Sequence, residues 1–208
     1  MASHVSAIQP ATTLLSWLGP YAWPGIPSQL GSLAPLGKTS ETQRGGVYLM
    51  TVEYEAGGYI IFGVGITGRP FAKRFAEHRR SYLTGSYNIL DTPSLRRGIR
   101  HQIWHGFWSE PRVGERAEEY ARRRDELRNL ALEQLRSTNI FVAHVDEPRL
   151  RARIEAGIMQ ILYSSAEPFR AIPDKGVHVE PRWRSESPIT VRNQCPQVLN
   201  ALPEMLSV

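Results

Sequence analysis

The sequence predicts an α+β fold in which a small three-stranded antiparallel sheet is flanked by helices. Two β-rich runs, 46–52 and 59–67, are separated by a short turn that contains Gly57 and Gly58, which is the pattern of a β-hairpin. Few polar residues interrupt either run, so we expect both faces of the hairpin to be covered. A third run, 139–146, predicts the third strand.

A helix is predicted directly after the hairpin, with Pro70 in its first turn, where proline is tolerated. One face of this helix is formed by residues at helical spacing: Phe71, Phe75, His78 and Tyr82. Arg74 and His78 lie one turn apart along the flank of that face. A cation and an imidazole are therefore aimed at the edge of the sheet, where the hydroxyl of Tyr48 could come within reach of both.

A second helix is predicted from about Thr92 to Phe107, with an apolar face and a basic face. With the pair at the end of the previous helix, its arginines form a candidate phosphate-binding surface: Arg79, Arg80, Arg96, Arg97 and Arg100. An ordinary solvated helix face is the alternative interpretation. His101 and His105 have the spacing of two zinc ligands, but no third ligand accompanies them, so a zinc site is disfavoured.

The segment from Val113 to Arg136 mixes charges of both signs around an apolar seam, which predicts one long amphipathic helix. We interpret it as a helical insertion at about 110–137, packed by one stripe and otherwise solvated. A helix that forms a homodimer is the alternative.

Glu155 lies in the last predicted helix, which begins at Pro148. Its neighbours, from Ile154 to Met159, are apolar. A carboxylate among apolar residues is costly unless it is paired or binds a cation, and this cost singles out Glu155. The alternative is an ion pair with Arg151, one turn earlier, on the solvated edge of the helix.

These residues together resemble the GIY-YIG nuclease superfamily. The matching positions, in order, are Gly46-Val47-Tyr48, Val64-Gly65, Arg74, His78 and Glu155. The resemblance covers 46–163 and carries two departures. The second tyrosine of the family should stand near Gly63 and is absent, unless Phe62 or Tyr59 takes its place. The family asparagine beyond the glutamate is also missing, since Glu167-Pro168-Phe169-Arg170 stands there instead, and we do not expect Asn193 to replace it.

The resemblance implies a metal-dependent endonuclease that hydrolyses DNA, with RNA not excluded. Tyr48, Arg74, His78 and Glu155 would be catalytic, and Glu155 would bind Mg²⁺ (or Mn²⁺). A compact chain of this kind looks most like a type II restriction endonuclease. Two alternatives remain open: a catalytically inactive nucleic-acid-binding protein on the same fold, or a protein-interaction module that uses the charged helix and the tryptophan-rich amino terminus.

Composition is consistent with a nucleic-acid partner. The 208 residues carry a net charge of +5, and only 3 of the 25 basic residues are lysine. Arginine favours bidentate contacts with phosphate, although a codon bias would produce the same excess. Cys195 is the only cysteine, which excludes an internal disulfide framework.

We expect one domain with extensions. An amino-terminal extension, 1–44, would pack on the core or on a partner. The nuclease-like core would span 45–164, and a proline-rich carboxy-terminal extension would follow at 165–208. No apolar run is long enough to cross a membrane, and the amino terminus lacks the basic region of a secretory signal, so a cytoplasmic protein is expected.

Overall fold

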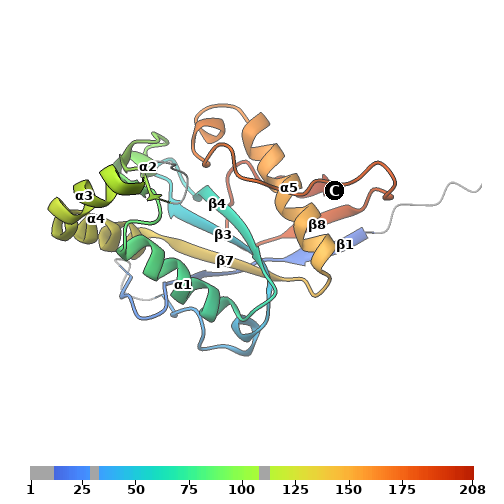
Figure 1. Cartoon of the computed structure of the whole chain (residues 1–208). Coiled ribbons are helices and arrows are strands. Elements are labelled where there is room, and N and C mark those ends of the chain that lie inside the picture. The colour runs from blue at the N-terminus through green and yellow to red at the C-terminus, as the bar shows by residue number, and fades with distance from the viewer. Residues whose placement is uncertain (1–11, 29–32, 108–112) are drawn as a thin grey trace, which may run out of the picture.

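A computed structural model of the chain describes residues 12–28, 33–107 and 113–208 (Figure 1). The predicted α+β class is confirmed. At its centre lies a four-stranded antiparallel sheet in the order β2 (Leu18–Tyr21), β7 (Asn139–His144), β3 (Gly46–Glu53) and β4 (Tyr59–Thr67). The hairpin and the third strand stand where the sequence predicted them. The prediction of three strands is wrong, because β2 pairs with the free edge of β7.

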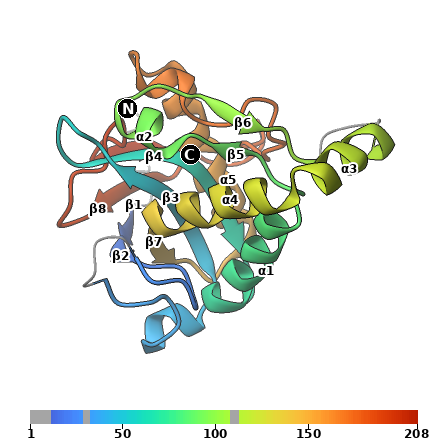
Figure 2. The ribbon, with the colours of Figure 1, turned by 90° about the vertical axis from the view of Figure 1, so that its left-hand side faces the viewer.

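Helices cover the two faces of this sheet (Figures 1 and 2). On one face, α1 (Phe71–Leu83) and α4 (Arg124–Ser137) pack against side chains of β3 and β7 such as Tyr48 and Val142. On the other face, α5 (Pro148–Ser164) packs against alternate residues of the same strands, such as Leu49 and Phe141. Strand β4 is one edge of the sheet, so side chains from the two faces can meet beside it.

Both terminal segments take part in the core. Strands β1 (Thr12–Ser16), β8 (Thr190–Gln194) and β9 (Met205–Ser207) form a second, mixed sheet, in which β1 and β8 are parallel. Trp17 and Trp23 are only 2% and 1% exposed. The indole nitrogen of Trp17 donates a hydrogen bond of 3.0 Å to the side-chain oxygen of Asn193. Asn193 therefore has its side chain engaged within the second sheet.

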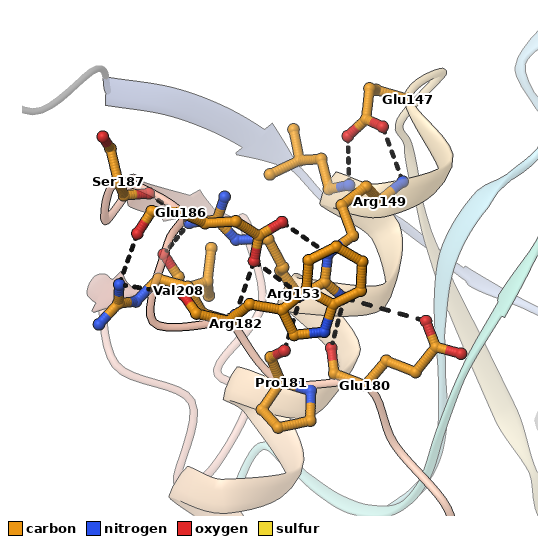
Figure 3. Close-up of polar contacts among 11 residues, drawn as sticks. Glu147, Arg149, Arg153, Glu180, Pro181, Arg182, Glu186, Ser187 and Val208 are labelled. Atoms are coloured by element: carbon orange, nitrogen blue, oxygen red, sulfur yellow. Dashed lines mark hydrogen bonds and ion pairs between the residues drawn. The ribbon is translucent and has the colours of Figure 1, made fainter.

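The segment 180–187 is fastened to the first turns of α5 by arginines (Figure 3). Nε and Nη2 of Arg149 each donate a 2.7 Å hydrogen bond to the carboxylate of Glu186. The same guanidinium stacks on the exposed ring of Trp183, 4.1 Å from its centroid. Deeper in the helix, Arg153 donates to backbone oxygens of Ser187 and Val208. These contacts fix the carboxy-terminal segment against the helix that carries Glu155.

The predicted helix over residues 92–107 is wrong. Helix α2 spans only Thr92–Arg96, and the chain then turns at Gly98, whose φ of +81° is left-handed and suits glycine. Residues after this turn form β6 (Gln102–Trp104), which pairs with β5 (Ile89–Leu90). His101 and His105 are therefore not one helical turn apart.

The charged segment forms two helices where one was predicted. Helices α3 (Val113–Arg122) and α4 are separated by a break at Arg123, whose φ and ψ of −106° and 14° are not helical. Helix α4 buries Leu127 and Ala131 against α1, whereas α3 projects from the molecule (Figure 2). Short 3₁₀ helices also lie at Ser40–Gln43 and Phe169–Ala171. None of the helices in the described part of the chain is long and apolar enough to cross a membrane.

Candidate functional site

A pocket of about 370 Å³ opens beside β4, where the two faces of the sheet meet. Four side chains line it that the sequence singled out as catalytic: Tyr48 from β3, Arg74 and His78 from α1, and Glu155 from α5. Helices α1 and α5 lie on opposite faces of the sheet, so this meeting was not guaranteed by the fold class. It occurs because the pocket lies at the sheet edge, which side chains from both faces reach.

Gly65 allows the ring of Tyr48 to lie across the edge strand. The two residues are directly opposite each other in the β3–β4 ladder. A Cβ atom at position 65 would lie 2.3 Å from the hydroxyl oxygen of Tyr48 and 2.4 Å from Cζ. Since no real side chain tolerates such distances, glycine at 65 is the condition for the phenol to reach the pocket.

His78 lies between two phenols. Its Nε2 is 2.8 Å from the hydroxyl of Tyr48, and its Nδ1 is 3.1 Å from the hydroxyl of Tyr87. The imidazole is only 5% exposed. Burial, reinforced by the charges of Arg74 and Arg69, lowers the pKa of His78 to about 3. The histidine is therefore neutral at physiological pH, with one ring nitrogen protonated.

Tyr48 is almost completely buried, with only 3% of its surface exposed. Desolvation raises its pKa to about 12, and the nearby carboxylate of Glu155 acts in the same direction. The guanidinium of Arg74 opposes the rise, first through its charge and then through a side-chain hydrogen bond with the phenol. Arg74 is thus the group that stabilises negative charge on Tyr48.

Arg74 keeps hydrogen-bond donors available for an anion. Its Nε is buried and has no partner in the structure. Its Nη1 is 3.7 Å from a carboxylate oxygen of Glu77, but Glu77 already accepts two hydrogen bonds of 2.7 Å from Arg69. A half-buried guanidinium whose Nε donor is unused suits a phosphate oxygen, which accepts such bonds well.

Glu155 points into the same pocket from α5. Burial raises the pKa of its carboxyl group to about 7, with a smaller contribution from Glu180, while the charge of Arg74 opposes the rise. The alternative partner predicted from the sequence, Arg151, donates instead to the backbone oxygens of Val145 and Asp146. Glu155 is therefore a desolvated carboxylate that is only partly compensated, and a cation in the pocket would stabilise its charged form.

The donor set at Glu155 fits a magnesium-like ion better than zinc. In the described residues, no group of three or more histidine, cysteine, aspartate or glutamate side chains could hold a metal ion. Zinc sites need three or four such ligands. Mg²⁺ is commonly held by one or two carboxylates and completes its shell with water and phosphate oxygens. The single carboxylate of Glu155 meets that requirement.

The structure shows what surrounds Gly63, near which the resemblance predicts a second tyrosine. Gly63 lies opposite Met50, and a Cβ atom at 63 would lie 2.4 Å from the terminal methyl carbon of Met50. Phe62 lines the pocket without a hydroxyl, and Tyr59 packs on Phe141 on the other face of the sheet. Neither residue provides a second phenol at the site.

Tyr87 and Gln134 line the pocket and were missed by the sequence analysis. Tyr87 follows α1, and a hydrogen bond from the side chain of the next residue, Asn88, to Asp174 holds this segment in place. Gln134, from α4, is buried and accepts a hydrogen bond from the backbone nitrogen of Leu90. No motif or periodicity marked either residue, since each reaches the pocket only through tertiary packing.

The predicted basic surface is not one helix face. Its members fall on three segments: Arg79 and Arg80 on α1, Arg96 and Arg97 at the end of α2, and Arg100 in the loop that follows. Arg79 donates a 2.9 Å hydrogen bond to the carbonyl of Pro24. Arg100 is paired with Asp174, which also lines the pocket. Arg80 and Arg97 are exposed.

Fold and pocket together define an α+β protein with a partly enclosed polar site, built from phenols, a neutral histidine, a guanidinium and a carboxylate. Comparisons with protein-family models, with curated proteins and with solved structures found no match to this chain.

Proposed function

We propose that this protein is a metal-dependent endonuclease that hydrolyses phosphodiester bonds in DNA, with RNA as a possible substrate. The observation that supports the proposal most is the convergence of Tyr48, Arg74, His78 and Glu155 in one pocket, although they come from three distant segments of the chain. Their order along the sequence resembles the GIY-YIG superfamily, and within it a type II restriction endonuclease is the form we propose.

The side chains supply what phosphodiester hydrolysis needs. Arg74 donates to a non-bridging phosphate oxygen and stabilises the charge that develops on phosphorus. Tyr48 takes a proton from the attacking water while its own hydroxyl proton passes to Nε2 of His78, along the 2.8 Å hydrogen bond. Glu155 would hold Mg²⁺ (or Mn²⁺), which when bound supplies positive charge beside the scissile phosphate.

The first experiment compares plasmid cleavage in the presence of Mg²⁺ by the wild type and by the Glu155→Gln variant. Glutamine keeps the shape of the side chain but cannot provide a carboxylate. The matched control is Glu133→Gln, at an exposed position of α4. We expect cleavage by the wild type and by Glu133→Gln alone. Absence of cleavage by the wild type on any nucleic acid tested would overturn the proposal.

Replacement of Arg74 tests the anion-binding role directly. We expect Arg74→Ala to lower the rate of cleavage by about 10²–10³, the usual effect of removing one donor that stabilises transition-state charge. Arg136→Ala, at an exposed position of α4, should leave the rate unchanged. Single-turnover cleavage of a labelled duplex measures both. An unchanged rate for Arg74→Ala would remove Arg74 from the mechanism.

One observation favours a second candidate, an inactive nucleic-acid-binding protein. Met50 fills the place in which the resemblance expects a second tyrosine next to Gly63. Salt-sensitive DNA binding that is equal in the wild type and in Glu155→Gln, without cleavage by either, would support this candidate over the enzyme.

A further inference from the structure

His78 connects two tyrosines through opposite sides of its ring. A neutral imidazole has one nitrogen that donates and one that accepts a hydrogen bond. The two hydrogen bonds are therefore coupled: if Tyr48 donates to Nε2, then Nδ1 carries the proton and donates to Tyr87. In the opposite arrangement, Tyr87 donates and Tyr48 accepts.

The surroundings of Tyr48 select between these arrangements. The guanidinium of Arg74, which has only donors, acts on the Tyr48 oxygen through its charge and a side-chain hydrogen bond, both of which lower the pKa of Tyr48. If His78 also donated to that oxygen, the hydroxyl proton of Tyr48 would lose its acceptor at a side chain that is only 3% exposed. Tyr48 therefore donates to Nε2, and the proton of His78 lies on Nδ1, directed at Tyr87.

We propose that Tyr87 is a positioning residue that holds His78 in the Nδ1-protonated tautomer and receives the Nδ1 proton when Nε2 is protonated by Tyr48. This proposal rests on the proposed function and goes beyond it, because it assigns a role to a residue outside the motif.

The proton transfers balance along one chain of hydrogen bonds. The attacking water gives a proton to the oxygen of Tyr48, whose hydroxyl proton moves to Nε2 of His78. The proton on Nδ1 moves to the oxygen of Tyr87, and the hydroxyl proton of Tyr87 moves to solvent. Each tyrosine gains one proton and loses one, and His78 ends neutral in its other tautomer.

This arrangement removes a difficulty of the simpler mechanism. Burial and the charge of Arg74 make imidazolium unfavourable at His78. A histidine that only accepted a proton would have to become charged there, whereas one that also releases a proton stays neutral. Tyr87 suits the exit position because it is partly exposed, unlike Tyr48.

The tautomer can be measured without any substrate. The ¹⁵N chemical shifts of the imidazole distinguish a protonated from an unprotonated ring nitrogen, and His78→Gln identifies the signals of His78. We expect a proton on Nδ1 in the wild type. In Tyr87→Phe, Nδ1 loses its acceptor, so the Nε2-protonated tautomer should become populated. A proton on Nε2 in the wild type, or an unchanged tautomer in Tyr87→Phe, would overturn the proposal.

The matched control is Tyr120→Phe. Tyr120 donates a 2.7 Å hydrogen bond to the carbonyl of Leu83 at the end of α1, outside the pocket. This variant loses a comparable hydrogen bond to the same helix, so any general loosening of α1 would appear in it as well. We expect its His78 signals to match those of the wild type. Equal changes in both variants would reduce the role of Tyr87 to packing.

Kinetics separate this proposal from the proposed function. In single-turnover cleavage we expect Tyr87→Phe to lower the maximal rate by about tenfold, part of the effect of a positioned proton acceptor, with an unchanged half-saturating DNA concentration. If the wild type cleaves DNA and Tyr87→Phe cleaves it at the same rate, the proton-relay role of Tyr87 is overturned and the proposed function is not. No cleavage by the wild type would overturn the proposed function, and the ¹⁵N spectra would still decide the tautomer.

Discussion

A side chain at Gly46 and a side chain at Gly65 would collide with different parts of the structure. A Cβ atom at Gly46 would lie 2.0 Å from the backbone oxygen of Ala143, so substitution there must displace β7. A Cβ atom at Gly65 would collide with the Tyr48 side chain, which can move. Gly46→Ala should therefore lower the free energy of unfolding by about 1–3 kcal/mol or more, the cost of overpacking. Chemical denaturation measures this loss.

Gly65→Ala should affect activity more than stability, since it displaces the Tyr48 ring from the pocket. We expect its cleavage rate to fall by about 10²-fold or more, as for the loss of a positioned proton-transfer group. Gly114→Ala in α3 is the control, because its Cβ would meet nothing within 4 Å. A Gly65→Ala variant with the wild-type rate would show that the position of the Tyr48 ring is not critical.

The protonation of Glu155 should link stability to pH. Because its pKa is raised from 4.5 to about 7, the folded state binds an extra proton between these values. This extra proton raises the free energy of unfolding at low pH, and that stabilisation is lost as the pH rises from 4.5 through 7. In the metal-free protein, Glu155→Gln should therefore become more stable relative to the wild type over that range. Thermal unfolding of both proteins at several pH values measures the difference.

His78 acts in the opposite direction, which is why the difference between the two proteins is the useful quantity. The pKa of His78 is lowered from 6.5 to about 3. Its neutral form therefore contributes to the free energy of unfolding above pH 6.5, and this stabilisation is lost as the pH falls through 3. This loss is common to the wild type and Glu155→Gln. A pH-independent difference between the two proteins would contradict the raised pKa of Glu155.

At the scale of elements, the amino-terminal extension supports the helix that carries Arg74 and His78. The ring of Trp23 packs edge-on against Phe75 at 4.9 Å and Tyr82 at 5.9 Å. We expect Trp23→Ala to lower the free energy of unfolding by about 3–5 kcal/mol, because it leaves a large cavity. Leu14→Ala, at a side chain that is 58% exposed, should cost less than about 0.5 kcal/mol. Urea denaturation measures both, and equal effects would show that the extension is not part of the core.

The elements predicted correctly from the sequence are those with strong periodicity: the hairpin, α1, β7 and α5. The failures have local causes. An apolar repeat suggested a helix through 92–107, but Gly98 adopts a left-handed conformation and ends it. Strand β2 could not be predicted, because four residues with a proline form a strand only when β7 offers a free edge.

The four motif residues could be placed in one site because each has a recognisable spacing or an unfavourable apolar context. Tyr87 could not, since it lies outside the periodic part of α1 and meets His78 only after the chain turns at Gly85. The filled space beside Gly63 was also invisible, because it depends on the register that places Met50 opposite.

At the scale of the whole molecule, the net charge of +5 does not identify which arginines meet a nucleic acid. The structure separates neighbours that the sequence treats alike. Arg79 is tied to the carbonyl of Pro24, whereas its neighbour Arg80 is exposed on α1. A guanidinium can replace counterions on a phosphate backbone without breaking a hydrogen bond inside the protein only if it has no such bond to begin with.

This difference gives a matched pair for DNA binding. In the Glu155→Gln background, which should bind without cleavage, we expect Arg80→Ala to reduce the slope of log affinity against log salt by about 1, the effect of losing one phosphate contact. Arg79→Ala should leave the slope unchanged and lower the thermal stability, because it removes the link to Pro24. Fluorescence anisotropy with a labelled duplex measures the slopes. If Arg79→Ala reduced the slope and Arg80→Ala did not, the phosphate-binding surface would lie on the other side of α1.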